Sequence, residues 1–257
     1  MTALPRIEAD AFGQDQVELD GVKSARRTLE ILNLFEEERR PLLAAEVAAG
    51  LAAPLSSTSI LLRTMVAAGF LRFERAGRRY LPSARVALLG AWLSPAMLGE
   101  GRLLRLMQAL SEATGETIML GTKNGWRMQY MHVLQATRPL RVHVRPSSFR
   151  SLLRSAGGWM LLSTAGDAEA RALIRRINAE APAGHQVREE VALRRLATIR
   201  AEGQATSYDE VTPGAGGIAM LVPGVDGPPL AMVLAGPTAR LRDEHAALLN
   251  TLRSLLT

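Results

Sequence analysis

The stretch from Pro41 to Tyr80 constrains the fold of this chain more than any other part of its sequence. Apolar residues recur there first with a helical period and then with the period of strands, and glycine and proline mark the breaks. The predicted parts are a helix at residues 44–49, a break at 50–54, a second helix from Ser56 to a left-handed cap at Gly69, and strands at 70–74 and 78–81 that meet at Gly77. Two short helices followed by a hairpin are typical of a winged helix-turn-helix.

The second of these helices has two chemically different sides. One side is predicted to be buried, because its residues recur at helical spacing: Thr58, Leu61, Leu62 and Met65. The other side carries small hydroxyl groups and one arginine: Ser56, Ser57, Ser59, Ile60, Arg63 and Thr64. Such a surface suits a groove of DNA, where hydroxyl groups, the arginine and apolar groups can contact base edges.

Four arginines crowd the predicted hairpin: Arg72, Arg75, Arg78 and Arg79. A basic wing of this kind is expected to lie against phosphates. A helix with Ser24 as its cap precedes this region, and its predicted buried face consists of Ala25, Leu29, Leu32 and Phe35. Arg26 and Arg27 lie in its first turn, where cations oppose the helix dipole, so we expect them to contact phosphate as well. On residue chemistry alone, the alternative is an ordinary helical hairpin with a solvated basic surface.

From Val22 to Leu93 the sequence resembles the DNA-binding half of the IclR family of bacterial transcription regulators. The resemblance is carried by Ser24-x-x-Arg27-x-Leu29-x-Ile31-Leu32, Ser56-Ser57-Thr58, Leu61-Leu62-Arg63-Thr64, Ala68-Gly69-Phe70-Leu71 and Arg79-Tyr80. The second half resembles the effector domain of the same family through Gly115-Glu116-Thr117, Ala156-Gly157-Gly158, Ile199-Arg200-x-x-Gly203, Ile218-Ala219-x-x-Val222 and Ala235-Gly236-Pro237. The resemblance implies a double-stranded DNA operator, a small organic acid effector and a homodimer or dimer of dimers.

Composition limits the size of the core, the compartment and the kinds of partner that the chain can have. The chain has 257 residues, of which 47% are hydrophobic, and these suffice for two modest cores. It contains no cysteine, its beginning lacks the regions of a signal peptide, and no apolar run approaches the roughly 20 residues that span a bilayer. We therefore expect a cytoplasmic protein without membrane contact. The net charge of +6 favours an anionic partner, although many arginine-rich proteins have this balance without binding nucleic acid.

The expected organisation has four parts: a disordered acidic tail at residues 1–20, the winged helix-turn-helix at 21–83, a linker and dimerisation helix at 84–100, and a GAF-like effector domain at 101–257. Val86, Leu89, Trp92 and Leu93 of this apolar helix can be buried within its own domain or, as the family resemblance implies, can pack against the same helix of a second subunit. Strands are predicted in the effector domain at 117–121, 126–134, 140–144, 205–208, 217–222 and 230–235, and helices at 103–114, 158–164, 167–178, 188–201 and 240–256. The expected fold class is α+β with an antiparallel six-stranded sheet.

The family's pattern places the ligand pocket between this sheet and the helix that starts near Gly157. A glycine-rich helix start offers N–H groups to a carboxylate, although the alternative is that these glycines only permit tight packing. The candidate effector-binding residues are Met119, Met128, Ala156, Gly157, Gly158, Tyr208, Gly217, Val233 and Ala235. Gly217, Val233 and Ala235 stand where relatives that bind small polar acids often carry polar or sulfur side chains. The expected effector is therefore aromatic or otherwise apolar in its body.

Two further expectations concern readout and chemistry. Leu55 and Ile60 stand where the family often has a basic residue, so base readout is expected to rest on serines, Arg63 and apolar contact to thymine methyl groups. The four histidines lie far apart and no nucleophile or phosphate-loop motif occurs, so we expect no catalytic residues, no metal site and no cofactor. The alternative function is a GAF-like small-molecule-binding protein or enzyme whose winged domain serves only dimerisation.

Overall fold

A computed structural model describes residues 6–8, 22–89, 101–225 and 227–256 of the chain. These residues fall into two compact units, the first within residues 17–100 and the second made of residues 101–257 with the start of the chain. From the predicted disordered tail, Arg6–Glu8 instead form strand β1, which pairs in parallel with a strand of the second unit. The other residues of that tail lie outside the described residues.

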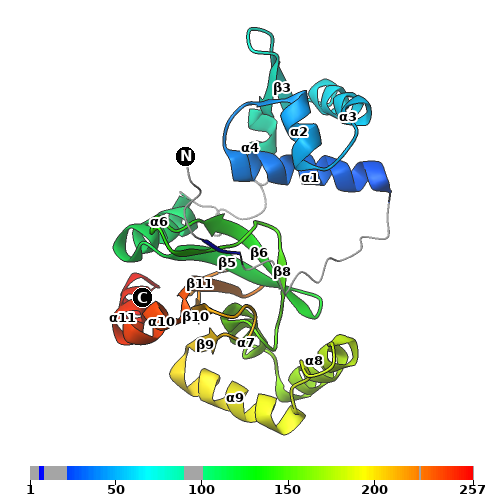
Figure 1. The fold of residues 1–257 in the computed structure, drawn as a ribbon. Helices are drawn as coiled ribbons and strands as arrows, with labels where there is room; N and C mark the ends of the chain where they lie inside the picture. The colour runs from blue at the N-terminus through cyan, green and yellow to red at the C-terminus, as the bar shows by residue number, and fades with distance from the viewer. Residues whose placement is uncertain (1–5, 9–21, 90–100, 226, 257) are drawn as a thin grey trace. The chain divides into compact units, whose positions relative to one another are not determined.

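The first unit is a winged helix-turn-helix, as predicted (Figure 1). Its elements in chain order are α1 (Lys23–Glu38), β2 (Leu42–Leu43), α2 (Ala44–Gly50), α3 (Leu55–Ala67), β3 (Leu71–Glu74), β4 (Arg79–Pro82) and α4 (Ala84–Leu88). The three strands form an antiparallel sheet in the order β2-β4-β3. Because β4 lies between the other two strands, the hairpin β3–β4 is fastened to the segment that leads into α2.

The core of this unit confirms the predicted buried side of α3. Thr58, Leu62 and Met65 are buried, and Leu61 is half-buried. Glu46 fixes the start of α2, because its Oε2 accepts the Leu43 N–H at 2.7 Å. That backbone hydrogen bond, together with the Arg40 guanidinium, holds the pKa of Glu46 below its usual range.

The prediction for α1 was partly wrong. The helix begins at Lys23 with Val22 as its N-cap and has no side-chain cap, so Ser24 does not cap it. Its buried residues are Ile31 and Phe35, whereas Leu29 is 58% exposed. The leucines of this helix recur at spacings that fit more than one buried face. The packing of α2 and α3 against α1 decides which face is buried, and the periodicity of the sequence does not contain that information.

The second unit contains an antiparallel six-stranded sheet in the order β8-β6-β5-β11-β10-β9. Its strands are β5 (Thr117–Asn124), β6 (Arg127–Leu134), β8 (Phe149–Ser151), β9 (Ala205–Tyr208), β10 (Ala215–Leu221) and β11 (Leu230–Pro237). Its helices are α6 (Arg102–Thr114), α7 (Ala156–Leu162), α8 (Asp167–Glu180), α9 (Glu189–Glu202), α10 (Thr238–Asp243) and α11 (His245–Leu256).

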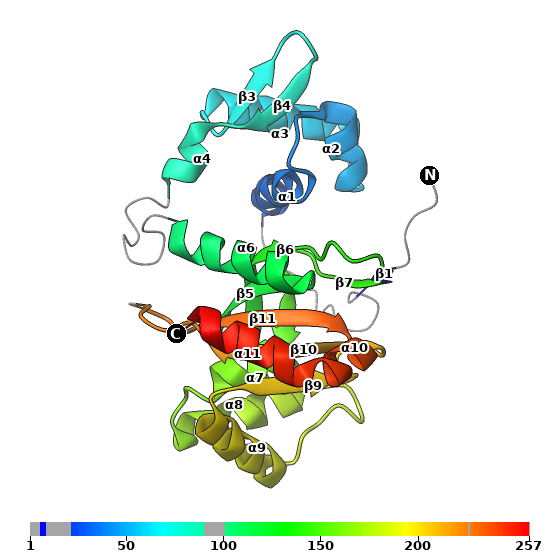
Figure 2. The same cartoon turned by 90° about the vertical axis from the view of Figure 1, so that its left-hand side faces the viewer.

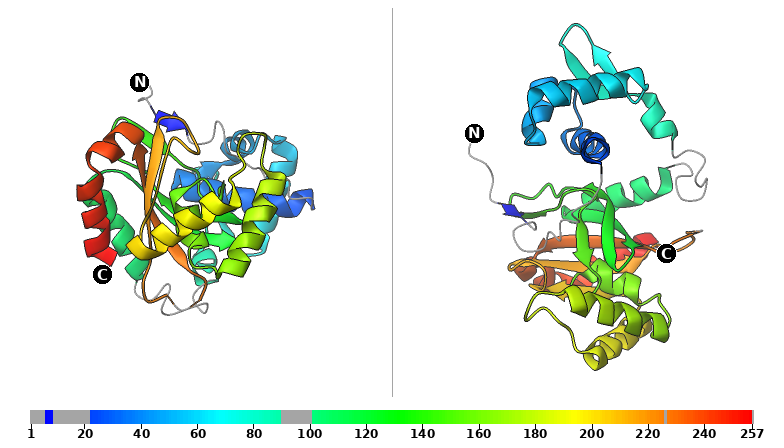
Figure 3. Two further views of the ribbon diagram at one scale, coloured as in Figure 1. Left: turned by 90° about the horizontal axis from the view of Figure 1, so that it is seen from below. Right: turned by 90° about the vertical axis from the view of Figure 1, so that its right-hand side faces the viewer.

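The helices of this unit cover both faces of the sheet. Helices α6, α10 and α11 lie on one face, and α7 lies on the other with α8 and α9 beyond it (Figures 2 and 3). The largest core fills the space between the sheet and α7, with Trp159, Leu161 and Met128 among its fully buried side chains. The second unit is thus a three-layer α+β domain whose central helix presses directly on the sheet.

Three details of the second unit differ from the prediction. The predicted strand at 140–144 is β7 (Arg141–His143), which pairs with β1, and β8 takes the sixth place in the sheet. The predicted helix at 240–256 is divided at Glu244 into α10 and α11. A β-bulge at Met131 interrupts the regular alternation expected of the strand predicted at 126–134, so Tyr130 and Val133 both face the core.

The predicted linker helix is described only in its first part, as α4. Leu89, next to its end, is 50% exposed, and Trp92 and Leu93 lie outside the described residues. In the described part of the chain, no single helix is long and apolar enough to cross a membrane, and α2 with α3 passes that test only as a pair bent by 114°.

Candidate DNA interface and ligand cavity

The candidate DNA surface of the first unit combines the outer side of α3 with the wing. Ser56, Arg63 and Thr64 are exposed, and Ser57 and Ser59 are half-buried. Two large apolar side chains also project from this helix, since Leu55 is 50% and Ile60 56% exposed. This surface therefore offers hydroxyl groups, one guanidinium and apolar groups, as the sequence predicted, and α3 begins at Leu55, one residue before the predicted start.

The wing turns through Arg75, Ala76, Gly77 and Arg78, and Arg78 adopts a left-handed backbone with φ of 49°. The side chains of Arg75 and Arg78 are exposed at this tip. Arg79 differs, because its Nη1 donates to the Pro41 carbonyl at 3.0 Å. That contact fastens β4 to the segment before β2, so Arg79 is engaged within the protein and less available to phosphate than the sequence suggested.

The two arginines at the start of α1 also have partners within the unit. Arg26 Nε lies 3.4 Å from Glu30 Oε1, and Arg27 Nη1 donates to Ser57 Oγ at 3.4 Å. The second contact joins α1 to the start of α3. Arg27 therefore lies beside the predicted recognition helix, in a position to support Ser57 as well as to meet an anion.

The second unit contains a cavity of about 50 Å³ between the sheet and α7. It is lined by Met119, Tyr130, Val142, Val144, Arg150, Ser155, Ala156, Ser207, Val211, Thr212, Ala215, Gly216, Gly217, Val233 and Ala235. Five of the residues predicted from the sequence are among them: Met119, Ala156, Gly217, Val233 and Ala235. The structure thus brings these five residues together from three strands, β5, β10 and β11, and one helix, α7, which are far apart in the chain.

Gly157 and Gly158 are not in this lining, and their surroundings support tight packing. A Cβ on Gly157 would lie 2.6 Å from Met128 Sδ, and one on Gly158 would lie 2.5 Å from the Ser151 carbonyl oxygen. The N–H groups of this helix start are also in use. Ala156 N–H donates to Ser207 Oγ at 3.0 Å, and Gly158 N–H donates to Ser155 Oγ at 3.1 Å. The expectation that the start of α7 offers free N–H groups to a carboxylate is therefore not supported at Ala156 and Gly158.

The remaining two candidates lie elsewhere. Met128 is fully buried and packs against Gly157 and Gly121 in the core. Tyr208 lines a separate groove at the β9 edge of the sheet, between α9 and the helices α10 and α11, where its hydroxyl lies 2.9 Å from His245 Nδ1. Successive residues of a strand point to opposite faces, so Ser207 and not Tyr208 faces the cavity.

Arg150 is the charged residue among the cavity residues that were not predicted from the sequence. It is 3% exposed, its Nη1 donates to the Phe149 carbonyl at 2.7 Å, and its Cζ lies 5.7 Å from the centre of the Tyr130 ring. Among the described residues that line the cavity it is the one with a formal charge. Burial raises the pKa of Tyr130, an effect that Arg150 partly opposes, so this phenol stays neutral at pH 7. Arg150 was missed because β8 was not predicted.

The loop between β9 and β10 covers one end of the cavity through Val211 and Thr212. Asp209 holds the loop from within, since its Oδ1 accepts the Gly214 N–H at 2.7 Å and the Thr238 hydroxyl at 3.0 Å. Arg195 binds both carboxylate oxygens of Glu210 at 3.0 and 2.8 Å, and Arg154 donates to the Glu210 carbonyl. A ligand that enters at this end must displace a loop that ion pairs hold in place.

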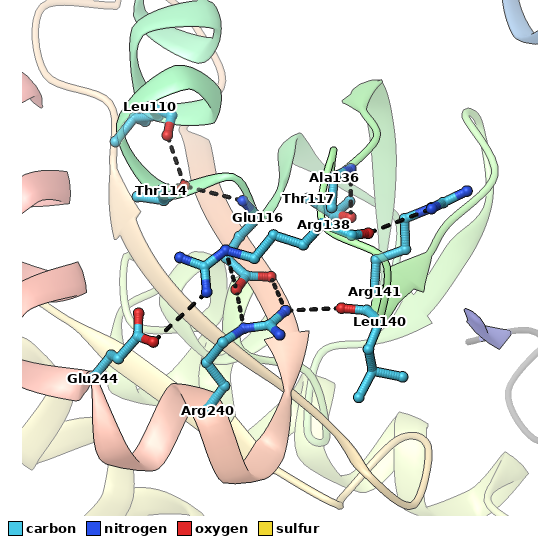
Figure 4. Close-up of polar contacts among 10 residues, drawn as sticks. All are labelled: Leu110, Thr114, Glu116, Thr117, Ala136, Arg138, Leu140, Arg141, Arg240 and Glu244. Atoms are coloured by element: carbon cyan, nitrogen blue, oxygen red, sulfur yellow. Dashed lines mark hydrogen bonds and ion pairs between the residues drawn. The ribbon is translucent and has the colours of Figure 1, made fainter. Parts of the chain in front are cut away.

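A buried ion-pair cluster lies at the start of β5, next to α10 (Figure 4). Glu116 is fully buried and receives Arg240 on both carboxylate oxygens, and Arg138 Nε lies 3.7 Å from the same carboxylate. Arg240 also donates to the Leu140 carbonyl at 2.9 Å. A Cβ on Gly236 would lie 2.6 Å from Glu116 Oε2, so the glycine leaves room for the carboxylate. The cluster ties the start of β5 to α10 and to the segment that leads into β7.

Comparison with known protein families adds to this geometry. The IclR helix-turn-helix domain matches residues 24–75, and the bacterial transcriptional regulator IclR C-terminal domain matches residues 102–255. The chain belongs to the IclR family. The helix-turn-helix match spans the winged unit from the start of α1 to the end of β3, the cavity lies within the C-terminal match, and the chain is a DNA-binding transcription regulator of this family.

Relatives agree with the IclR assignment. The HTH-type transcriptional regulator BhcR of Paracoccus denitrificans (strain Pd 1222) is 27% identical over 242 residues, which are 93% of this chain and 85% of that protein. The effector domain of an IclR regulator from Acinetobacter sp. ADP1 is 29% identical with a TM-score of 0.60, and it covers 63% of this chain and 96% of its own. An IclR homologue from Microbacterium hydrocarbonoxydans, complexed with 4-hydroxybenzoate, shares the fold with a TM-score of 0.58 at 20% identity over 90% of this chain and 100% of its own.

Proposed function

We propose that this IclR-family regulator binds its operator as a homodimer or a dimer of dimers in the cytoplasm, and that a small organic acid with an apolar body controls the binding. The observation that carries the proposal is the lining of the cavity. Its middle is apolar, through Met119, Val233 and Ala235, and among the described residues of its lining the one formal charge, that of Arg150, is positive. Such a site favours an anion whose other end is hydrophobic.

The lining of the cavity, rather than its size, supports an acid with an apolar body. A cavity of about 50 Å³ is smaller than the roughly 150 Å³ of an apolar cavity that binds benzene, so a one-ring acid requires the cavity to widen. The 4-hydroxybenzoate bound by the Microbacterium homologue is of the fitting class, which makes it a reasonable first probe.

On the DNA side, we propose that Ser56, Ser57, Ser59 and Arg63 face the major groove while Arg75 and Arg78 contact phosphates. Arg26 and Arg27 flank the groove from α1. The exposed Leu55 and Ile60 suit thymine methyl groups. Ligand binding can be coupled to DNA affinity through α4 and the segment that follows it, provided that the ligand prefers one arrangement of the subunits.

Two measurements on the full-length protein test this proposal. Affinity for its own upstream region should fall log-linearly with salt and should exceed affinity for random DNA of equal length. A thermal-shift screen should find stabilisation by aromatic or medium-chain acids before small keto acids, and a stabilising acid should change the DNA affinity. The proposal fails if binding to the upstream region is no tighter than to random DNA, or if only small polar acids stabilise the protein.

A further inference from the structure

We propose that the Tyr130 hydroxyl donates a hydrogen bond to the carboxylate of the effector, so that Tyr130 selects acids over apolar molecules of the same shape. The inference rests on the proposed function, because it names the residue through which the cavity would recognise an acid. Its basis is a buried hydroxyl group. Tyr130 lines the cavity and is 5% exposed, and in the described part of the chain no group forms a hydrogen bond with its hydroxyl.

Backbone hydrogen bonds fix the position of this side chain. The Tyr130 N–H donates to the Ser148 carbonyl at 3.0 Å, and the Tyr130 carbonyl accepts the Ser147 N–H at 2.9 Å. The side chain lies on the core face of β6, as does that of Val133 beyond the bulge. Because the backbone is held by the segment that leads into β8, the ring is a fixed part of the cavity wall.

Packing alone does not explain why this residue is a tyrosine. Phenylalanine would place the same ring against the core and would leave no polar atom without a partner. A buried O–H group loses its hydrogen bonds to bulk water, and this loss is costly unless another acceptor replaces them. The acceptor for the Tyr130 hydroxyl must therefore come from what the cavity holds.

The serine hydroxyls of the lining differ from Tyr130, because each has a partner within the protein. Ser155 Oγ donates to the Ser151 carbonyl at 3.0 Å and is the N-cap of α7. Ser207 Oγ accepts the Ala156 N–H at 3.0 Å, at the first residue of the same helix. Both serines thus hold the start of α7 in place, whereas the Tyr130 hydroxyl fastens no described part of the chain.

A carboxylate is the acceptor that suits this hydroxyl best. Burial raises the pKa of Tyr130, so the phenol keeps its proton at pH 7 and can donate it. The buried side chains of Met119, Val142 and Val144 also line the cavity, so a carboxylate that leaves water for this site needs a donor there. A hydrogen bond to an ionised oxygen is roughly twice as strong as one between neutral groups.

The test uses three probes that share one ring. They are 4-hydroxybenzoate, benzoate, which lacks the para hydroxyl, and 4-methylphenol, which has a methyl group in place of the carboxylate. Dissociation constants are measured by calorimetry at pH 7 on the full-length parent, on Tyr130→Phe and on the control Tyr80→Phe, which makes the same change at a buried tyrosine of the first unit. Tyr130→Phe should bind both acids about 10- to 100-fold more weakly and should bind 4-methylphenol as tightly as the parent does. Tyr80→Phe should bind all three probes like the parent.

The stability of the free protein provides a second measurement, which also decides the case if 4-methylphenol binds too weakly for calorimetry. Tyr130→Phe should unfold at pH 7 at the same temperature as the parent or above it, because the hydroxyl that it removes has no partner among the described residues. A hydroxyl that served only the fold would behave differently. A lower unfolding temperature, together with equal weakening of all probes that bind the parent, would overturn the inference.

The outcomes separate this inference from the proposed function. If Tyr130→Phe binds both acids as tightly as the parent does, Tyr130 is not the donor and the acid-responsive regulator still stands. If 4-hydroxybenzoate and 4-methylphenol weaken while benzoate does not, the hydroxyl contacts the other end of the ligand and the inference is wrong. If the parent binds neither acid, the acid site in this cavity and the role of Tyr130 are both wrong.

Discussion

Replacing Arg240 with methionine should destabilise the second unit far more than replacing its ion-pair partner Glu116 with glutamine. The two side chains differ in their access to water, since the Glu116 side chain is 0% and the Arg240 side chain 20% exposed. Without Arg240 the Glu116 carboxylate stays buried, with Arg138 at 3.7 Å as its closest remaining cation among the described ion pairs. Without the carboxylate, Arg240 retains the Leu140 carbonyl and some contact with water.

The expected magnitudes follow from that asymmetry. Removal of one partner from a buried ion pair costs about 3–5 kcal/mol, so Arg240→Met should lower the midpoint of thermal unfolding by roughly 6–20 °C in a unit of this size. Glu116→Gln removes a charged hydrogen bond but leaves the Arg240 guanidinium in contact with water. Such a loss costs about 1–3 kcal/mol. The double variant Glu116→Met with Arg240→Met should recover much of the loss, because a buried pair replaced by apolar side chains is often neutral.

The assay is urea and thermal unfolding of the full-length protein by circular dichroism, and the single variant Glu116→Met completes a double-mutant cycle with Arg240→Met and the double variant. The control is Arg175→Met, which breaks an ion pair with Glu189 at 3.0 Å where the arginine side chain is 71% exposed. That change should cost about 0–1 kcal/mol. The reasoning is refuted if Arg240→Met costs no more than the control, or less than Glu116→Gln, since the buried carboxylate would then not depend on Arg240.

Three further predictions address the wing, the packing of α7 and the pH dependence. Arg75→Ala with Arg78→Ala should weaken binding to all DNA sequences alike and lower the salt slope by about two per subunit. Arg63→Ala should instead change the sequence preference. The control pair Arg175→Ala with Arg188→Ala should change neither the salt slope nor the sequence preference. Gly158→Ala should cost more stability than Gly157→Ala within a range of about 1–3 kcal/mol, measured by urea unfolding, because its Cβ meets backbone of Ser151 and Leu152 while that of Gly157 meets side chains. Burial raises the pKa of Tyr130, so the folded state keeps a neutral phenol that the unfolded chain ionises, and stability should be lost as pH rises above about 10. Tyr130→Phe should lose less stability between pH 8 and pH 10.5 than the parent, and an equal loss in both would contradict the assignment.

Much of the first unit could be predicted because its signals are local. Hydrophobic periodicity, the glycine at 69 and the basic hairpin each depend on residues within one or two turns of each other, and the structure has the predicted helices and wing within a few residues. The predicted buried face of α1 was partly wrong, and the reason is physical. Leu29 fits a helical stripe but is exposed, because only the packing of α1 on α2 and α3 decides which of several leucine stripes is buried.

The cavity shows the limit of such reasoning most clearly. Sequence resemblance led to Met119, Ala156, Gly217, Val233 and Ala235, all of which line it. Gly157 and Gly158 were assigned to the ligand, but their missing side chains make room for Met128 and for the backbone of Ser151. A pattern of glycines indicates that space or backbone freedom is needed at those positions, but it does not indicate which group occupies the space.

The sequence by itself determined the family, the order of the elements and the chemistry available on each, because these follow from local spacing and motifs. Only the tertiary structure decided that Arg150, in a strand too short to leave a periodic signal, lies in one cavity with Tyr130 and Val233. The physical reason is the strand order, which places β8, β6, β5 and β11 side by side although the residues between them span more than half of the second unit. Neighbours across a sheet are set by pairing between distant segments, and no local pattern in the chain records that pairing.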